Sequence, residues 1–104
     1  MNITIVGCGN IGTQFAVHCA NKKHCVTIYC SRPASVSKTL KIVDSEGVTF
    51  LSGNIHLATN DEDLAFKDAD LIFVTVPAFA MNDYAQKIIP HLKKGAMICL
   101  TPGT

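Results

Sequence analysis

The chain has 104 residues, of which 48% are hydrophobic and 16% charged, and its formal net charge at pH 7 is +1. This length fits one domain, and the composition excludes a disordered chain, because disorder goes with low hydrophobicity and high net charge. The near-neutral charge, without a cluster of lysines and arginines, argues against nucleic acid or an anionic membrane as a partner. The sequence contains neither a secretory signal nor the roughly 18–20 apolar residues of a membrane span, which predicts a cytoplasmic protein.

The cysteines and histidines predict neither disulfides nor a metal centre. The five cysteines are an odd number without a C-x-x-C pair, so we interpret them as reduced, small core residues. The four histidines have no metal-ligand spacing among themselves or with the cysteines. No nucleophile lies beside a base and an orienting acid, so we predict no catalytic residue within the chain.

The most informative segment is a short apolar strand that leads into a glycine-rich turn. Residues 3–6 are predicted as a strand, and G-C-G-N-I-G follows before a helical pattern. This order is typical of a dinucleotide pyrophosphate site, in which backbone N–H groups at the helix start hold the phosphates. Gly7 permits the tight turn, Gly9 lets the backbone approach the phosphates, and Gly12 lets the helix lie close to the strand. The predicted phosphate-binding residues are Gly7, Gly9, Asn10, Ile11 and Gly12.

The middle of the chain departs from a regular alternation of helices and strands. The first helix is predicted to end at Asn21 as a left-handed cap, and a strand follows over 25–30. A tight hairpin is predicted at Ser52-Gly53-Asn54, because Gly-Asn is a recognised hairpin dipeptide. The remaining expected elements are a short helix over 34–38, strands over 40–43, 48–51 and 55–58, and a turn at 44–47.

The alternation returns in the second half of the chain. Thr59-Asn60-Asp61-Glu62 matches a capping box for a short helix that ends near Lys67. The further expected elements are an apolar strand over 71–76, a helix over 80–89 stopped by Pro90, and a strand over 96–100. Together these elements predict an α/β fold: a Rossmann-like, doubly wound, mostly parallel sheet with a small antiparallel excursion around residues 40–58.

The end of the second strand predicts which dinucleotide is bound. NAD-specific sites usually carry an acid about 20 residues beyond the glycines, and this chain has Cys30-Ser31-Arg32 there. Ser31 can donate one hydrogen bond to a 2′-phosphate and Arg32 a charge-assisted one, so the segment favours NADP, with NAD as the alternative. A solvated arginine that contacts no ligand is the competing interpretation.

A second segment at a strand end is predicted to border the cofactor. Val76, Pro77, Ala78 and Phe79 leave the 71–76 strand at its carboxyl end, where ligands bind in open α/β folds. The alternative is a strand stopped by proline, with Phe79 in the core. Thr101 and Pro102 follow the last strand in the corresponding place and are weaker candidates.

These motifs together resemble the amino-terminal domain of the octopine/nopaline (opine) dehydrogenases. The resemblance rests on the glycine turn, Ser31-Arg32, the run D-L-I-F-V-T-V-P-A-F-A ending at Ala80, and the run H-L-K-K-G-A-M-I-C-L-T-P-G starting at His91. More broadly the chain is similar to the cofactor domains of ketopantoate reductase, glycerol-3-phosphate dehydrogenase and 6-phosphogluconate dehydrogenase-like enzymes. Met81-Asn82 stands where many opine enzymes have a histidine, so no substrate contact is carried over there.

The resemblance implies a dehydrogenase or reductase that transfers hydride between NAD(P)H and a carbonyl or imine substrate. It also implies a following helical domain with the catalytic groups, so we expect residues 1–104 to be a truncated dinucleotide-binding domain that is inactive by itself. A nucleotide-sensing regulatory module that binds NAD(H) without catalysis is the alternative. We also expect a small-molecule substrate for the whole protein, and self-association through the last strand as a route to a homodimer.

Overall fold

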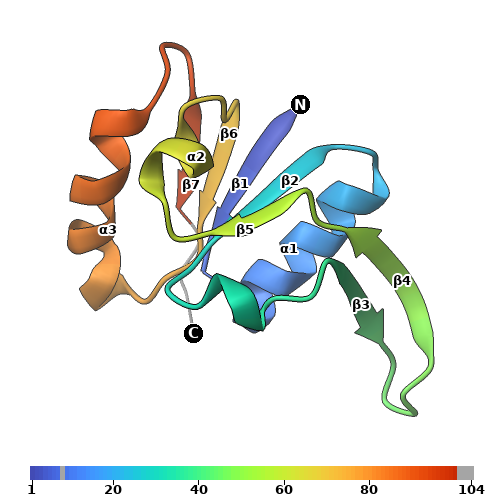
Figure 1. The fold of residues 1–104 in the computed structure, drawn as a ribbon. Helices are drawn as coiled ribbons and strands as arrows, with labels where there is room; N and C mark the ends of the chain where they lie inside the picture. Colours follow the sequence, from blue (N-terminus) through green and yellow to red (C-terminus); the bar gives the residue numbers. More distant parts are fainter. Residues whose placement is uncertain (8, 101–104) are drawn as a thin grey trace.

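The computed structural model describes residues 1–7 and 9–100 and, among these, not the side chains of Asn10, Ile11, Phe50 and Ala78. Its centre is a five-stranded, wholly parallel sheet in the order β5-β2-β1-β6-β7 (Figure 1). The predicted Rossmann-like, doubly wound fold is therefore confirmed. The strands of this sheet are β1 (Asn2–Val6), β2 (Cys25–Tyr29), β5 (Leu57–Thr59), β6 (Leu71–Val74) and β7 (Met97–Leu100).

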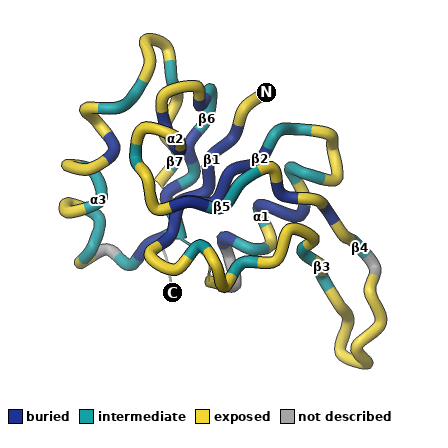
Figure 2. The backbone as a smooth tube through the Cα atoms, viewed as in Figure 1, coloured by how far each residue is buried: buried dark blue, intermediate teal, exposed yellow. Residues whose placement is uncertain are grey.

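Helices cover both faces of the sheet, which explains why its central strands are mostly apolar. Helix α1 (Asn10–Asn21) packs on one face, and α2 (Glu62–Phe66) and α3 (Met81–Ile88) pack on the other. Figure 2 shows β1 and β2 buried between these layers. Three short 3₁₀ turns complete the elements: η1 (Pro33–Ser35), η2 (Ala78–Ala80) and η3 (Ile89–His91). Within the described residues, no helix is long and apolar enough to cross a membrane.

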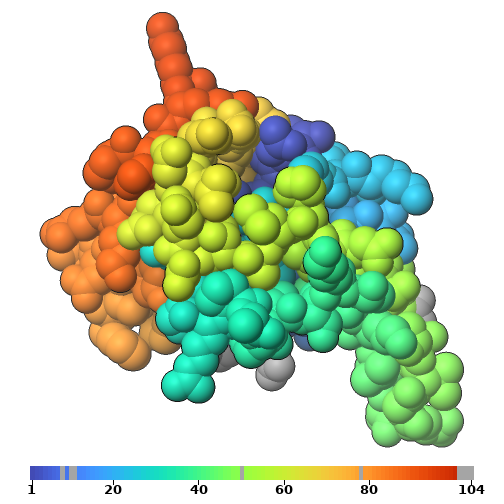
Figure 3. Space-filling view, viewed as in Figure 1, coloured from blue at the N-terminus to red at the C-terminus, as the bar shows by residue number. Residues whose placement is uncertain are grey.

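An antiparallel hairpin of β3 (Thr39–Val43) and β4 (Thr49–Asn54) takes the place of a long crossover helix between β2 and β5. The arm projects from the body of the molecule (Figures 1 and 3). Its turn is held by Asp44, whose Oδ1 accepts from the backbone N–H of Glu46 and of Val48 at 2.9 Å. The predicted antiparallel excursion and the turn at 44–47 are thus confirmed.

The expected hairpin at residues 52–54 is wrong, because these residues lie inside β4. Gly53 is buried against α1, where a Cβ atom would stand 2.7 Å from the Cβ of Ala20. The glycine therefore serves close packing of strand on helix instead of a turn. The strand after it, β5, leaves the hairpin and joins β2 in parallel, with Tyr29 opposite Thr59.

Two predicted helix caps also differ from the structure. The left-handed residue after α1 is Lys23, with φ of 71°, while the Asn21 amide donates to the carbonyl of Ser52 at 3.1 Å. Helix α2 is capped by Asp61, whose Oδ1 accepts from Leu64 N–H at 3.1 Å. The Thr59 hydroxyl accepts from Asp61 N–H at 3.0 Å and so forms a turn before the helix instead of a capping box.

The other element boundaries shift by a few residues. The apolar 71–76 run leaves the sheet after Val74, since Thr75 and Val76 turn toward η2. Pro90 stops regular helix as predicted and lies within η3. The predicted 34–38 helix is reduced to the single turn η1, which begins at Pro33.

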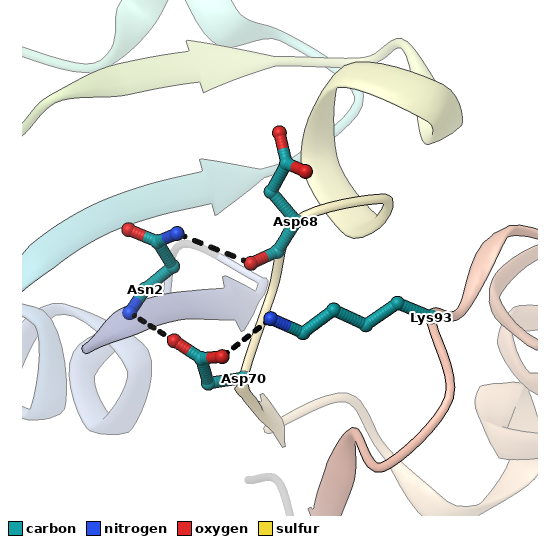
Figure 4. A network of polar contacts seen from close by, with 4 residues as sticks. All are labelled: Asn2, Asp68, Asp70 and Lys93. Atoms are coloured by element: carbon teal, nitrogen blue, oxygen red, sulfur yellow. Dashed lines mark hydrogen bonds and ion pairs between the residues drawn. The ribbon is translucent and has the colours of Figure 1, made fainter.

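A polar network ties the amino-terminal ends of three parts of the sheet together (Figure 4). The Asp70 carboxylate accepts from Asn2 N–H at 2.8 Å and from the Lys93 ammonium at 2.5 Å. The Asn2 amide also donates to the carbonyl of Asp68 at 3.2 Å. The bond from Lys93, followed by the bond from Asn2, lowers the pKa of Asp70 below its ordinary 3.8. This network joins β1, the start of β6 and the segment before β7 at the edge opposite the glycine turn.

We predict that Asp70→Asn lowers the melting temperature at pH 7. Because the pKa of Asp70 is lower in the folded than in the unfolded chain, its stabilising effect is complete above 3.8 and is lost as pH falls through the folded pKa. The difference in melting temperature between parent and variant should therefore vanish at acid pH. Asp68→Asn is the matched control, since Asp68 contacts Asn2 through its main-chain oxygen. A difference in melting temperature between parent and Asp70→Asn that stays the same from pH 7 to acid pH would contradict this account.

Candidate functional site

The turn from β1 into α1 has a backbone that requires glycine at its first position. Gly7 has φ of 107°, in the left-handed region that L side chains rarely adopt. Its N–H donates to the carbonyl of Tyr29 at 3.0 Å, and a Cβ atom there would lie 2.8 Å from Thr75 Oγ1. Residue 7 therefore joins the neighbouring strand ends while changing the direction of the chain.

The third glycine brings α1 against this turn. A Cβ atom on Gly12 would lie 2.8 Å from the carbonyl oxygen of Gly7 and 3.1 Å from Thr75 Oγ1. Thr75, which the sequence analysis did not single out, donates to the carbonyl of Val6 from its hydroxyl at 2.8 Å and from its N–H at 3.0 Å. Its one signal in the sequence is a lone hydroxyl within an apolar run. Thr75 thus lies directly behind the glycine turn.

The second glycine, by contrast, faces open space. Gly9 is the exposed residue that caps α1, and a Cβ atom there would meet nothing within 4 Å. The first N–H group bonded within the helix is that of Thr13, which donates to the Gly9 carbonyl at 2.9 Å; the N–H groups before it have no partner within the helix, and the first turn carries no acidic residue. Partial positive charge, free N–H groups and space coincide here, so the backbone fits an anion such as a diphosphate.

The residues after β2 lie at the carboxyl ends of the parallel strands, as the glycine turn does. Val6 at the end of β1 pairs with Tyr29 at the end of β2, which places Ser31 and Arg32 beside the glycine turn. Both residues are exposed, and the Arg32 carbonyl accepts from the Ser35 hydroxyl at 2.7 Å in η1. The segment Cys30-Ser31-Arg32 contains no acid, and Cys30 is buried. The main chain of Arg32 is therefore fixed while its side chain reaches solvent.

The segment after β6 borders this edge as well. Val74 pairs with Val6, and Val76 is buried just beyond it. Pro77 accepts from Ala80 N–H at 2.9 Å, which closes η2 around Ala78. Phe79 is 89% exposed, so the alternative that placed it in the core is wrong. Cys8, Thr101 and Pro102 lie outside the described residues.

A hollow of about 280 Å³ opens beside the end of β2, on the side of α2 and α3. We call it the β2-edge hollow. Tyr29, at its base, packs against Phe66 with ring centroids 5.0 Å apart and against Tyr84 at 6.3 Å. Burial, and then the neighbouring Glu62 carboxylate, raise the pKa of Tyr29. The residues that line the hollow include Tyr29, Ser31, Asn60, Glu62, Tyr84 and Lys87.

We predict that Gly12 and Gly9 respond oppositely to substitution. Gly12→Ala should lower the free energy of unfolding by about 1–3 kcal/mol, because its Cβ atom meets the main chain of Gly7. Gly9→Ser should leave stability within about 0.5 kcal/mol, because the side chain enters open space and serine is a favoured helix cap. Urea unfolding measures both. Equal losses in the two variants would show that Gly9 is also packed.

Comparisons with known proteins agree with this geometry. The sequence profile of the NAD-dependent glycerol-3-phosphate dehydrogenase N-terminus matches residues 2–103. A 2-dehydropantoate 2-reductase of Vibrio cholerae is 28% identical over 94% of this chain and 30% of its own length. An opine dehydrogenase of an Arthrobacter species is 32% identical over 95% of this chain and 28% of its own length. The chain thus spans less than a third of the length of these relatives.

Solved structures show the same fold. An octopine dehydrogenase in complex with NADH and agmatine superposes with a TM-score of 0.82 at 22% identity, over 97% of this chain and 28% of that one. An arogenate dehydrogenase of Synechocystis gives a TM-score of 0.75 at 25% identity, over 97% and 32%. The expected resemblance to cofactor domains of dehydrogenases is confirmed, and the comparisons support it over a regulatory module. The chain belongs to the family of NAD-dependent glycerol-3-phosphate dehydrogenase N-terminal domains.

Proposed function

We propose that this chain holds NADP(H) for an oxidoreductase that transfers hydride between the nicotinamide and a carbonyl or imine substrate. The observation that carries the proposal is the open space over Gly9 at the start of α1. Residues 7 and 12 are held in place by packing, whereas residue 9 faces no protein atom and leaves room for the phosphates. The bound nicotinamide would supply or accept the hydride, and the chain would bind and orient it.

The phosphate-binding part of the proposal comprises Gly7, Gly9, Asn10, Ile11 and Gly12. Their main chain would donate to the diphosphate from the first turn of α1, where the aligned peptide dipoles leave partial positive charge. No basic side chain is required, because the charge comes from the backbone. Val76, Pro77, Ala78 and Phe79 would border the cofactor from the end of β6.

The preference for NADP over NAD is proposed from the chemistry at the end of β2. The segment 30–32 contains no acid that would repel a 2′-phosphate, and exposed Ser31 and Arg32 can donate to one. Hydrogen bonds to charged groups contribute about 1.5–3 kcal/mol each, so Arg32 could supply roughly a 10- to 100-fold preference. NAD stays the alternative cofactor. It would be held mainly through the diphosphate, which NAD and NADP have in common.

The reaction of the whole protein is proposed by analogy with its relatives. One octopine dehydrogenase structure contains NADH and L-arginine, and another contains NADH and pyruvate. An amino acid and a keto acid together form an imine, which is a substrate for hydride transfer. Because this chain spans less than a third of its relatives, we assign the catalytic groups to a further helical domain.

We also propose that the protein is cytoplasmic and that it self-associates. A cytoplasmic location is proposed, and it is compatible with Cys19, Cys25 and Cys99, which form no disulfide among the described residues. Self-association is supported by β7, an edge strand on which Met97 and Leu100 are 63% and 65% exposed.

We predict that Arg32→Ala weakens NADPH binding by about 10- to 100-fold and leaves NADH binding within about 3-fold, because only NADPH carries the 2′-phosphate. Titration by nicotinamide fluorescence or calorimetry measures both affinities. Gly9→Ser is the contrasting variant: it should weaken both nucleotides alike, since it fills the space of the shared diphosphate. If the parent binds NADH as tightly as NADPH and Arg32→Ala changes neither, the NADP assignment is wrong.

A further inference from the structure

We propose that Thr75 is a positioning residue for the diphosphate, because its hydroxyl fixes the peptide from which the glycine turn begins. This inference rests on the proposed cofactor function and adds a side chain that acts through the main chain instead of contacting the ligand. Thr75 directly follows β6, which lies beside β1 in the sheet (Figure 1). It is the one polar residue in the run from Leu71 to Ala80. Its hydroxyl is therefore the only side-chain hydrogen-bonding group within that run.

The peptide between Val6 and Gly7 is held from both sides. Its carbonyl oxygen, on Val6, accepts from Thr75 twice: from the N–H at 3.0 Å and from the hydroxyl at 2.8 Å. Its N–H, on Gly7, donates to the carbonyl of Tyr29 at 3.0 Å. The two main-chain bonds continue the pairing of a parallel sheet and can form with any side chain, whereas the hydroxyl bond depends on Thr75. This third bond limits rotation of the peptide just before the chain turns at Gly7, where φ is 107°.

The same hydroxyl oxygen lies against the space that two glycines leave open. A Cβ atom on Gly7 would stand 2.8 Å from Thr75 Oγ1, and one on Gly12 would stand 3.1 Å from it. The oxygen therefore contacts the turn near both of its ends. A methyl group is larger than a hydroxyl and cannot donate, so valine at position 75 would release the Val6 carbonyl and press on the turn. The position of Gly7 relative to Gly12 thus depends on the Thr75 hydroxyl.

This dependence reaches the ligand through the first turn of α1. An anion at a helix start is held by several N–H groups that point at one place. A shift of Gly7 relative to Gly12 would move these groups apart and weaken their hold on the proposed diphosphate. Contacts of Arg32 with a 2′-phosphate lie outside the turn and would not change. NADPH and NADH share the diphosphate, so both should lose affinity alike.

The test is a titration of Thr75→Val, Thr75→Ser and the parent chain with NADPH and with NADH. We expect Thr75→Val to raise both dissociation constants by about 10-fold and to leave their ratio unchanged. Thr75→Ser keeps the hydroxyl and should bind both nucleotides within about 3-fold of the parent. Thr4→Val is the matched control, because the Thr4 hydroxyl also donates to a carbonyl, that of Ala65 at 2.5 Å, in a buried place outside the glycine turn. That variant should lower the melting temperature and keep both dissociation constants within about 3-fold.

The outcomes separate this inference from the cofactor proposal. If Thr75→Val binds both nucleotides as the parent does, or if Thr4→Val loses as much affinity, Thr75 does not position the turn, while the cofactor function stands. An equal loss in Thr75→Ser would assign the effect to the methyl group and overturn the inference. If a thermal melt shows that Thr75→Val is unfolded, Thr75→Ala, which adds no bulk, takes its place and should weaken both nucleotides where serine does not. If the parent binds neither nucleotide, the cofactor proposal fails and the inference fails with it.

Discussion

The close approach of α1 to the end of β1 is the constraint on which the site depends. Gly12 leaves no room for a side chain against the carbonyl of Gly7, and the Thr75 hydroxyl fills the space behind both residues. This contact fixes where the helix begins and therefore where its first N–H groups point. Gly9 alone of the three glycines faces no protein atom. The same turn thus separates two roles: Gly7 and Gly12 shape the fold, and Gly9 leaves space for a ligand.

The topology of the sheet then gathers the remaining parts of the site. The parallel order β5-β2-β1-β6-β7 brings the carboxyl ends of β1, β2 and β6 to one edge. The glycine turn, Arg32 and Phe79 leave the sheet at that edge, and α2 and α3 add Glu62 and Lys87 from one side. At the opposite edge, Asp70 joins Asn2 to Lys93 (Figure 4). The Asp70 network and the residues proposed to bind the cofactor are therefore placed at opposite ends of the strands.

The sequence predicted the parts of this molecule that local chemistry determines. The strand, glycines and helix at the amino terminus, the apolar central strands and the Asp44 turn all follow from short-range patterns. Gly53 was misassigned, because its role is contact with Ala20, which is distant in sequence. For a related reason Thr75 was not singled out, and Glu62 was interpreted only as part of a capping box. Their neighbours, Gly7 and Tyr29, are joined to them only by strand order, which single-residue patterns do not encode.

The central claim is that main-chain amides at the start of α1 hold a diphosphate, and amide chemical shifts test it most directly. In a ¹⁵N-labelled chain titrated with NADPH, the account predicts that the largest saturable shifts fall on the amides of Gly9, Asn10, Ile11 and Gly12. The amides of the turn at residues 44–47, at the projecting tip of the β3–β4 arm, should stay unchanged (Figure 1). Saturable shifts elsewhere with unmoved amides in residues 9–12, or no shifts at all, would contradict the account.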